Sequence, residues 1–284
     1  MTIPHAVRTF IRANNSGDII STDSIGGGCI NNGSRVVTST GDTFFLKQNE
    51  TSAEDMFLRE YEGLMALHVE NGPRVPEPLL HGNNFLLLED LAPARRATGY
   101  WQSFAHQLAE LHKNRKSRFG FDNNNYIGST AQDNTWEDDG YLFFGQNRLG
   151  KQAELGLKKG YLSSQDMDRI ERLIGKLNQL IPEQPASLLH GDLWTGNLIA
   201  DSQGNPALID PAVHFGWAEA DLAMTDLFGG FSDEFYAAYT EANPLTSGWK
   251  ERFPIYNLYH LLNHVNLFGL SYLGQVRTIL NTFV

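Results

Sequence analysis

The stretch LLHGDLWTGN at residues 188–197 decides the fold of this 284-residue chain, together with ALIDP at residues 207–211. Asp192 comes five residues before Asn197, and a second aspartate, Asp210, follows thirteen residues later. Phosphoryl transfer asks little covalent chemistry of a protein, but it needs a carboxylate near the attacking hydroxyl and oxygen ligands for Mg²⁺. This order and spacing is typical of a kinase catalytic loop and the metal-binding strand after it.

The motif assigns one role to each of its three polar side chains. Asp192 is predicted to be the catalytic base, while Asn197 and Asp210 are predicted to hold Mg²⁺ against the phosphates of ATP. The alternative is a simple turn at His-Gly-Asp, with Asn197 capping a helix. The complete ordered set favours the kinase interpretation.

A lysine upstream completes the pattern. Lys47 ends the apolar run FFLK at residues 44–47, and Glu60 lies on the helix predicted next. In kinases such a pair binds the α- and β-phosphates of ATP, with the glutamate orienting the lysine. Glu62 is the competing partner, but helical spacing places Glu60 in line with the apolar Met56 and Leu64.

Two further segments are predicted to contact the nucleotide. The glycine-rich turn GGGCINNG at residues 26–33 matches neither the P-loop nor the dinucleotide fingerprint, but its backbone N–H groups suit phosphate. Its predicted nucleotide-binding residues are Gly26, Gly27, Gly28, Cys29, Ile30 and Asn31. In LLLEDL at residues 86–91, the backbone around Glu89 and Leu91 is predicted to bind adenine.

The distribution of elements predicts an α+β protein with two lobes. Residues 1–92 carry predicted strands around one central helix, and form the nucleotide-binding lobe. Residues 93–99 are the hinge candidate, and residues 93–284 form a mainly helical catalytic and acceptor-binding lobe. Helices are predicted over residues 4–14, 53–70, 100–112, 163–181, 233–241 and 253–271. A long polar and aromatic stretch at residues 115–145 interrupts this order.

Composition excludes several other classes of protein. The formal net charge of −11 argues against nucleic-acid binding and against docking on anionic membranes. No run approaches the roughly 18 apolar residues of a membrane span, and the first residues lack the apolar core of a secretory signal. The single cysteine, Cys29, excludes an internal disulfide. We therefore expect a cytoplasmic protein.

These residues together resemble the fructosamine-3-kinase (ketosamine-3-kinase) family, relatives of the aminoglycoside phosphotransferases with a protein-kinase-like fold. Further matching segments are FLK at 45–47, NYIGST at 125–130, EADLAM at 219–224 and LLNHVNLFG at 261–269. The most discriminating element is Trp194-Thr195-Gly196, because aminoglycoside and choline kinases more often have His-Pro-Gly there. Gly140 departs from the family pattern, which more usually has Trp near the presumed acceptor site.

The resemblance implies ATP- and Mg²⁺-dependent phosphorylation of the sugar 3-hydroxyl of a ketosamine, free or on a glycated protein. The product then breaks down and releases the amine, so that the reaction acts as deglycation. It also implies that His190 buttresses the catalytic loop, and Asp221 at a helix start is expected to fix that loop through backbone hydrogen bonds. Trp194 is a candidate for contact with the sugar.

Three other interpretations remain open at this point. The first is a kinase of another small amine-bearing hydroxylated metabolite, such as an aminoglycoside or an amino alcohol. The second is a catalytically silent nucleotide-binding module. The presence of all four key residues, Lys47, Asp192, Asn197 and Asp210, disfavours it. The third concerns Cys29, whose thiol lies among predicted phosphate-binding amides. We hypothesise that its oxidation, or a disulfide joining two chains into a homodimer, regulates nucleotide binding.

Overall fold

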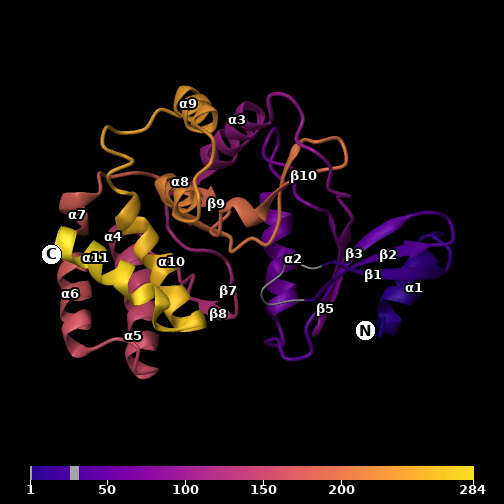
Figure 1. The fold of residues 1–284 in the computed structure, drawn as a ribbon, viewed down its shortest axis with the longest axis horizontal. Coiled ribbons are helices and arrows are strands. Elements are labelled where there is room, and N and C mark those ends of the chain that lie inside the picture. The colour runs from indigo at the N-terminus through magenta and orange to yellow at the C-terminus, as the bar shows by residue number, and fades with distance from the viewer. Residues whose placement is uncertain (1, 26–31) are drawn as a thin grey trace.

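In the computed structural model, which describes residues 2–25 and 32–284, the N-terminal part of the chain is built around one five-stranded antiparallel sheet. The strand order is β1-β2-β3-β5-β4. Its elements are α1 (His5–Ala13), β1 (Ile19–Ile25), β2 (Asn32–Thr38), β3 (Thr43–Gln48), α2 (Met56–Leu67), β4 (Pro78–Gly82) and β5 (Phe85–Glu89). The β1–β2 hairpin and α1 project away from the helical part (Figure 1).

Alternation along β5 explains why one helix covers each face of this sheet. Leu87 is buried together with Val7 and Ile11 of α1, whereas its neighbours Leu86 and Leu88 are buried in the main core with α2. Successive side chains of a strand point to opposite faces, so the run FLLLE supplies both faces with apolar surface. α1 therefore packs on one face of β5 and α2 on the other.

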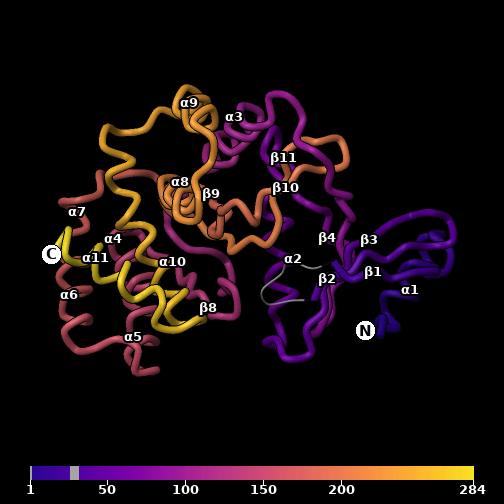
Figure 2. The backbone as a smooth tube through the Cα atoms, viewed as in Figure 1, coloured from indigo at the N-terminus to yellow at the C-terminus, as the bar shows by residue number. Residues whose placement is uncertain are grey.

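The rest of the chain is mainly helical. Its elements are α3 (Tyr100–Lys113), β6 (Arg115–Lys116), β7 (Asn125–Ile127), β8 (Thr130–Gln132), α4 (Gly140–Leu142), a π-helix (Phe143–Gly150), α5 (Lys151–Lys158), α6 (Ser164–Ile174), α7 (Leu177–Leu180), β9 (Ala186–Leu189), β10 (Leu198–Ala200), β11 (Pro206–Leu208), β12 (His214–Gly216), α8 (Ala218–Leu227), α9 (Asp233–Ala242), α10 (Phe253–Phe268) and α11 (Leu273–Phe283). Figure 2 shows α10 and α11 beside α4 and α5, at the end of the molecule remote from α1.

Most predicted elements are present, with three corrections. The helix predicted over residues 253–271 ends at Phe268, because Gly269 adopts a φ of +86°. The helix predicted over residues 163–181 is two helices, α6 and α7, separated at Gly175. The stretch 115–145 is not one long loop, because it contains the short β7–β8 hairpin, whose strands pair Asn125 with Gln132. The α+β architecture is as predicted.

The segment after β5 connects the sheet to the helical part. Ala92 adopts a positive φ of 44°, and the chain then runs along the β10–β11 hairpin, with Ala94 N–H donating to Ala200 O at 3.2 Å. The proposed boundary between residues 92 and 93 falls in this segment and stays a prediction. Within residues 2–25 and 32–284, none of the helices combines the length and apolar character required to cross a bilayer.

Candidate active site

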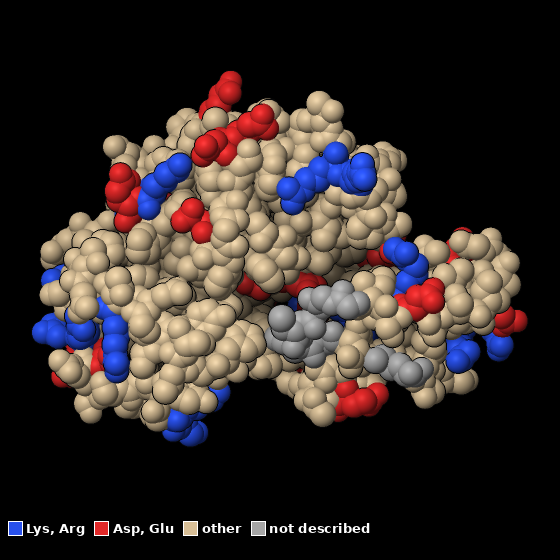
Figure 3. Space-filling view, in the orientation of Figure 1, with Lys and Arg blue, Asp and Glu red and all other residues tan. Residues whose placement is uncertain are grey.

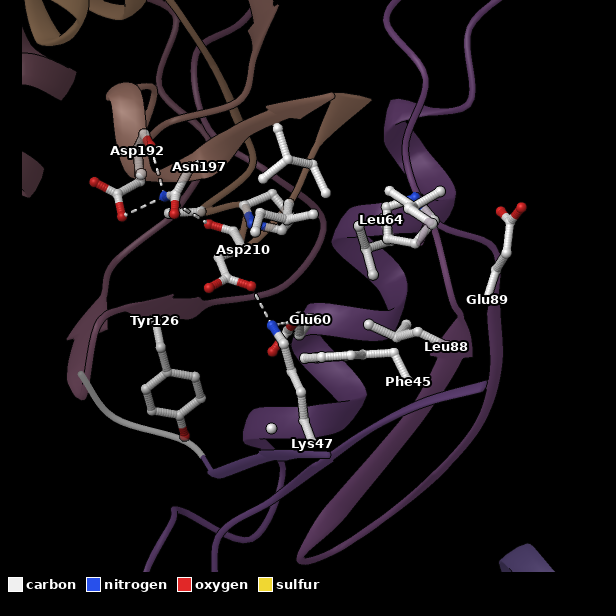
Figure 4. A pocket seen from close by; sticks show the side chains of 18 of the residues that line it. Phe45, Lys47, Glu60, Leu64, Leu88, Glu89, Tyr126, Asp192, Asn197 and Asp210 are labelled. Atoms are coloured by element: carbon white, nitrogen blue, oxygen red, sulfur yellow. Dashed lines mark hydrogen bonds and ion pairs between the residues drawn. The ribbon is translucent and has the colours of Figure 1, made fainter. Parts of the chain in front are cut away.

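Lys47 of β3 lies between two carboxylates from different parts of the chain. Its Nζ atom forms ion pairs with Glu60 of α2 and with Asp210, which follows β11 (Figure 4). Burial disfavours the charge of Lys47, but the negative charges of Asp210 and Glu60 outweigh burial and raise its pKa. The ammonium group therefore stays charged. The predicted partner Glu60 is confirmed, since Glu62 pairs instead with Arg59.

The catalytic-loop motif begins where β9 ends, and it turns at Gly191. Gly191 has a φ of +83°, and a Cβ there would lie 2.1 Å from the carbonyl oxygen of Ala212. Only glycine fits this position. The same approach allows Ala212 N–H to donate to His190 O at 2.8 Å, which ties the loop to the segment after Asp210.

Asp221 of α8 fixes this loop through hydrogen bonds to its backbone. Its carboxylate accepts hydrogen bonds from the backbone N–H groups of His190 at 2.7 Å and Gly191 at 2.9 Å. The buried His112 of α3 lies 3.2 Å from the same carboxylate, and its other ring nitrogen lies 2.7 Å from the hydroxyl of Tyr239. The predicted role of Asp221 is confirmed. His112 was missed, because nothing in the sequence relates residues so far apart.

His190 is a structural residue of the loop, as the resemblance implied. Its Nε2 atom bonds Ile209 O at 2.9 Å, and Nδ1 accepts from Asp192 N–H at 3.2 Å. Burial lowers the pKa of His190, so the ring is neutral at pH 7. The ring thereby links Asp192 to the residue that precedes Asp210.

Asp192 and Asn197 are in direct contact. Asn197 Nδ2 donates to the carbonyl oxygen of Asp192 at 2.8 Å and to its carboxylate at 3.1 Å. Burial, followed by the nearby charge of Asp210, raises the pKa of Asp192 to about 7, although the bond from Asn197 opposes both effects. A carboxylate with this pKa gains and loses a proton near neutral pH, as a general base requires.

Asp210 adopts a backbone conformation that L-residues rarely use. Its φ is +56°, in the left-handed region. Ile209 N–H, just before it, donates to Asn197 O at 3.0 Å, and Ala212, two residues later, is bound to His190. The strained residue is fixed on both sides, so its carboxylate points at Lys47.

One cavity of about 450 Å³, between the sheet and the helical part, is lined by Lys47, Glu60, Asp192, Asn197 and Asp210. Phe45, Leu64 and Leu88 form an apolar wall on one side, and Asp192, Asn197 and Asp210 stand opposite them (Figure 4). Acidic atoms are visible inside this hollow in the space-filling view (Figure 3). An apolar slot beside a cation and two carboxylates suits a flat base linked to phosphates.

The predicted adenine-binding residues Glu89 and Leu91 also line this cavity. The Glu89 side chain is turned to Arg74, with which it forms an ion pair, and it also accepts from Glu77 N–H at 3.3 Å. Its backbone pairs with Phe44 of β3. The backbone N–H of Glu89 donates to Glu77 O at 2.9 Å. The side chain and the backbone N–H of Glu89 are thus engaged, and its backbone carbonyl stays the candidate for contact with the base.

The oxygen donors present fit Mg²⁺. Asn197 uses Nδ2 to bind Asp192, which leaves its Oδ1 oxygen to face a cation beside the carboxylate of Asp210. Across the described part of the chain, no three His, Cys, Asp or Glu side chains gather as a metal cage. Mg²⁺ in phosphoryl-transfer sites commonly takes one or two protein oxygens and completes its shell with phosphates and water.

Trp194 lines the same cavity beside the catalytic loop. Its ring contacts Phe228 edge-on at 6.0 Å between centroids, and Phe228 in turn lies 5.0 Å from the ring of His264. These three aromatic rings come from distant segments of the chain, and only Trp194 was identified from the sequence as a candidate for contact with the sugar.

Gly140, in contrast, lies in a separate small cavity, where a Cβ would meet the rings of Phe119 and Trp217 at 2.6 and 2.8 Å. A Trp would not fit there.

The predicted phosphate-binding residues Gly26, Gly27, Gly28, Cys29, Ile30 and Asn31 lie outside the described residues. The flanking Ile25 and Gly33 line the cavity. The hypotheses about the glycine-rich turn and about a homodimer through Cys29 therefore stay predictions.

Fold and site together define a phosphotransferase of the protein-kinase-like class. Residues 4–284 match the family described as fructosamine kinase, and the chain belongs to this family. A probable ketoamine kinase of Synechocystis is 38% identical over 264 residues, which cover 90% of this chain and 88% of that protein. A chloroplastic protein-ribulosamine 3-kinase of Oryza sativa subsp. indica is 38% identical over 94% of this chain and 79% of its own length.

Solved structures agree with this assignment. A putative fructosamine-3-kinase from Thermobifida fusca superposes with a TM-score of 0.89 at 28% identity, over 98% of each chain. The enzyme APH(2")-IIa, solved in a complex with gentamicin, shares the fold alone, with a TM-score of 0.63 at 11% identity over 100% of this chain and 96% of its own. The resemblance found in the sequence is thereby confirmed, and the chain is an ATP-dependent kinase of the sugar-amine-phosphorylating family.

Proposed function

We propose that this protein transfers the γ-phosphoryl group of MgATP to the 3-hydroxyl of a ketosamine, with Asp192 as the base. The observation that carries the proposal is the convergence of Lys47, Asp192, Asn197 and Asp210 on one cavity. Family membership supports a sugar amine as the acceptor. The phosphorylated product would then break down and release the free amine.

The chain's own groups suffice to position the reactants. The acceptor oxygen attacks the γ-phosphorus as its proton passes to a carboxylate oxygen of Asp192, and the bond from the γ-phosphorus to the β,γ-bridging oxygen breaks. Lys47, held by Glu60, neutralises the α- and β-phosphates of the leaving ADP. Asn197 and Asp210 would hold Mg²⁺, which neutralises the phosphate charge when bound.

Two features of the chain are compatible with a ketosamine acceptor. Trp194, backed by Phe228, offers an aromatic face on which a sugar ring or chain can rest, beside Asp192. The chain is also acidic, with a net charge of −11, and this charge favours an acceptor that carries an amine. The second feature fits aminoglycosides and choline equally, so the choice rests on family membership.

The test is ATP consumption with Mg²⁺ and a panel of acceptors. A synthetic fructosamine, a ribulosamine, an aminoglycoside and choline are compared for wild type and Asp192→Asn. We expect turnover only with the first two acceptors, and a fall of about 10²–10⁴-fold in the variant with ATP binding retained. Turnover restricted to the aminoglycoside or choline would reject the ketosamine as the substrate. Turnover unaffected by Asp192→Asn would reject Asp192 as the catalytic base.

A further inference from the structure

The β7–β8 hairpin is anchored to the segment that follows Asp210. Asn125 Nδ2 donates to Val213 O at 2.9 Å, and Gln132 Nε2 donates to Ala212 O at 3.2 Å. The hydroxyl of Tyr259 in α10 donates to Gln132 Oε1 at 2.7 Å. Asn125, Gln132 and Tyr259 are all buried. Buried side-chain amides with several partners fix the position of a hairpin, because each lost bond would leave a polar group unsatisfied.

The next residue, Tyr126, faces the opposite way and reaches α2. Its hydroxyl donates a 2.6 Å hydrogen bond to Oδ1 of Asp55, the residue directly before α2. Asp55 makes no capping bond to the helix backbone, and its other oxygen accepts from Arg59 Nε at 2.9 Å. A side chain at this position usually caps its own helix. Here the carboxylate instead joins α2 to the hairpin.

Other contacts along α2 meet the same part of the molecule. A Cβ on Gly63 would lie 3.3 Å from Val213, so the helix backbone packs closely on the segment that holds Asn125. Asn123 Nδ2 donates to Glu62 Oε2 at 3.2 Å. Glu60, the partner of Lys47, lies between these contacts and Asp55 along the helix. Glu60 therefore lies between two points at which α2 contacts the helical part.

We propose that Tyr126 is a positioning residue, which fixes α2 on the helical part through Asp55 and so keeps Glu60 against Lys47 before nucleotide binds. Tyr126 lies on one side of Asp210, and the apolar wall of the cavity lies on the other side (Figure 4). The inference rests on the proposed function only in assigning Lys47 and Glu60 to the binding of phosphate.

The first test compares Tyr126→Phe with Tyr141→Phe. Each substitution removes one hydroxyl from a partly buried tyrosine, but Tyr141 donates to Ile181 O at 3.0 Å, away from α2. We expect Tyr126→Phe to weaken MgATP binding about tenfold, the scale of one hydrogen bond to a charged group. Amide hydrogen exchange in residues 56–67 should also become faster. Tyr141→Phe should change neither quantity.

The second test varies the acceptor of the hydrogen bond. Asp55→Asn keeps an oxygen that can accept from Tyr126 and should retain near-normal exchange in α2, whereas Asp55→Ala should behave like Tyr126→Phe. The double variant Tyr126→Phe/Asp55→Ala should be no worse than either single one. Additive losses would mean that the two residues act separately, which would overturn the inference.

The two proposals fail in different ways. An effect of Tyr126→Phe confined to the KM of the acceptor, with α2 exchange unchanged, would make Tyr126 a substrate contact and overturn the inference. Absence of ketosamine turnover in wild type would reject the proposed substrate. MgATP binding and α2 exchange would still decide the role of Tyr126, because neither measurement needs an acceptor.

Discussion

The side-chain nitrogen of Asn197 bonds both the backbone oxygen and the carboxylate of Asp192, at 2.8 and 3.1 Å. One residue thus orients the predicted base, and these bonds leave its side-chain oxygen for the predicted Mg²⁺. Under the proposed function, the same amide group would lie between the base and the metal. The predictions below follow from this arrangement and from the residues around it.

Turnover should depend on the protonation state of Asp192. Burial raises the pKa of this carboxyl to about 7, and only the deprotonated form can accept a proton. We expect kcat/KM for the acceptor, measured at saturating MgATP, to rise with pH and to level off by about pH 7, because Mg²⁺ beside Asp210 would lower the pKa of Asp192 in the complex. The residual activity of Asp192→Asn should lack this rise. A wild-type profile that stays flat between pH 5 and 8 would contradict the assignment.

The same pKa predicts that Asp192 destabilises the protein at alkaline pH. A carboxyl that titrates near 4 when unfolded and near 7 when folded keeps its proton only in the native state across that window, so stability falls as pH rises from 4 to 7. The free energy of unfolding of Asp192→Asn should exceed that of the wild type by roughly 1–3 kcal/mol at pH 8, and the two should be equal at pH 4. Urea unfolding at both pH values measures this difference.

Lys47 should matter for stability as well as activity. Lys47→Met leaves the carboxylate of Glu60, whose side chain is only 12% exposed, without its cation. Loss of one partner of a buried ion pair costs roughly 2–4 kcal/mol. Adding Glu60→Gln should recover about half of that loss while MgATP binding stays weak. No recovery in the double variant would show that Glu60 is not stabilised by Lys47.

The left-handed backbone conformation of Asp210 is expected to lower the stability of the protein, while its carboxylate is required for activity. Asp210→Gly and Asp210→Ala both remove the carboxylate, and both should abolish turnover. They differ in the strain of the left-handed conformation, with φ at +56°, which glycine adopts freely. We expect the glycine variant to be more stable than the alanine variant by about 1 kcal/mol, measured by thermal unfolding. Equal stability would argue against strain at this position.

Gly191 should tolerate no side chain. In Gly191→Ala the new methyl would overlap the carbonyl oxygen of Ala212, 2.1 Å from the Cβ, so the loop must move. We expect a loss of at least about 3 kcal/mol and of most activity. Gly160→Ala is the control, because Gly160 has a similar φ of +74° with no atom within 4 Å of a Cβ. It should cost only about 1 kcal/mol.

The predicted chemistry is largely local in the sequence. The interval from Asp192 to Asn197 is one short turn, and a two-stranded hairpin, β10–β11, returns the chain to Asp210. Segments this short can adopt few conformations, so their spacing was enough to predict that Asp192, Asn197 and Asp210 lie close together. The pairing of Lys47 with Glu60 could also be predicted, because helical periodicity separates Glu60 from Glu62.

Other features could not be predicted from one sequence. The helix predicted over residues 163–181 ends before Gly175, which is the C-cap of α6, because the prediction followed the apolar spacing and gave no weight to this glycine. The β7–β8 hairpin was missed since its strands have three residues each and gain their order from bonds to Ala212 and Val213. The contacts of Asp221 with His112, and of Trp194 with Phe228, join segments that carry no shared pattern.

The sequence by itself determined the class of reaction and the fold of this protein, because a kinase site needs a few residue types in a fixed order along short connected segments. The tertiary structure alone decided how those groups are tuned. Burial raises the pKa of Asp192, two carboxylates from distant elements keep Lys47 charged, and Tyr126 joins α2 to the helical part through Asp55. Such effects depend on distance and solvent exclusion, which arise only when remote segments pack together.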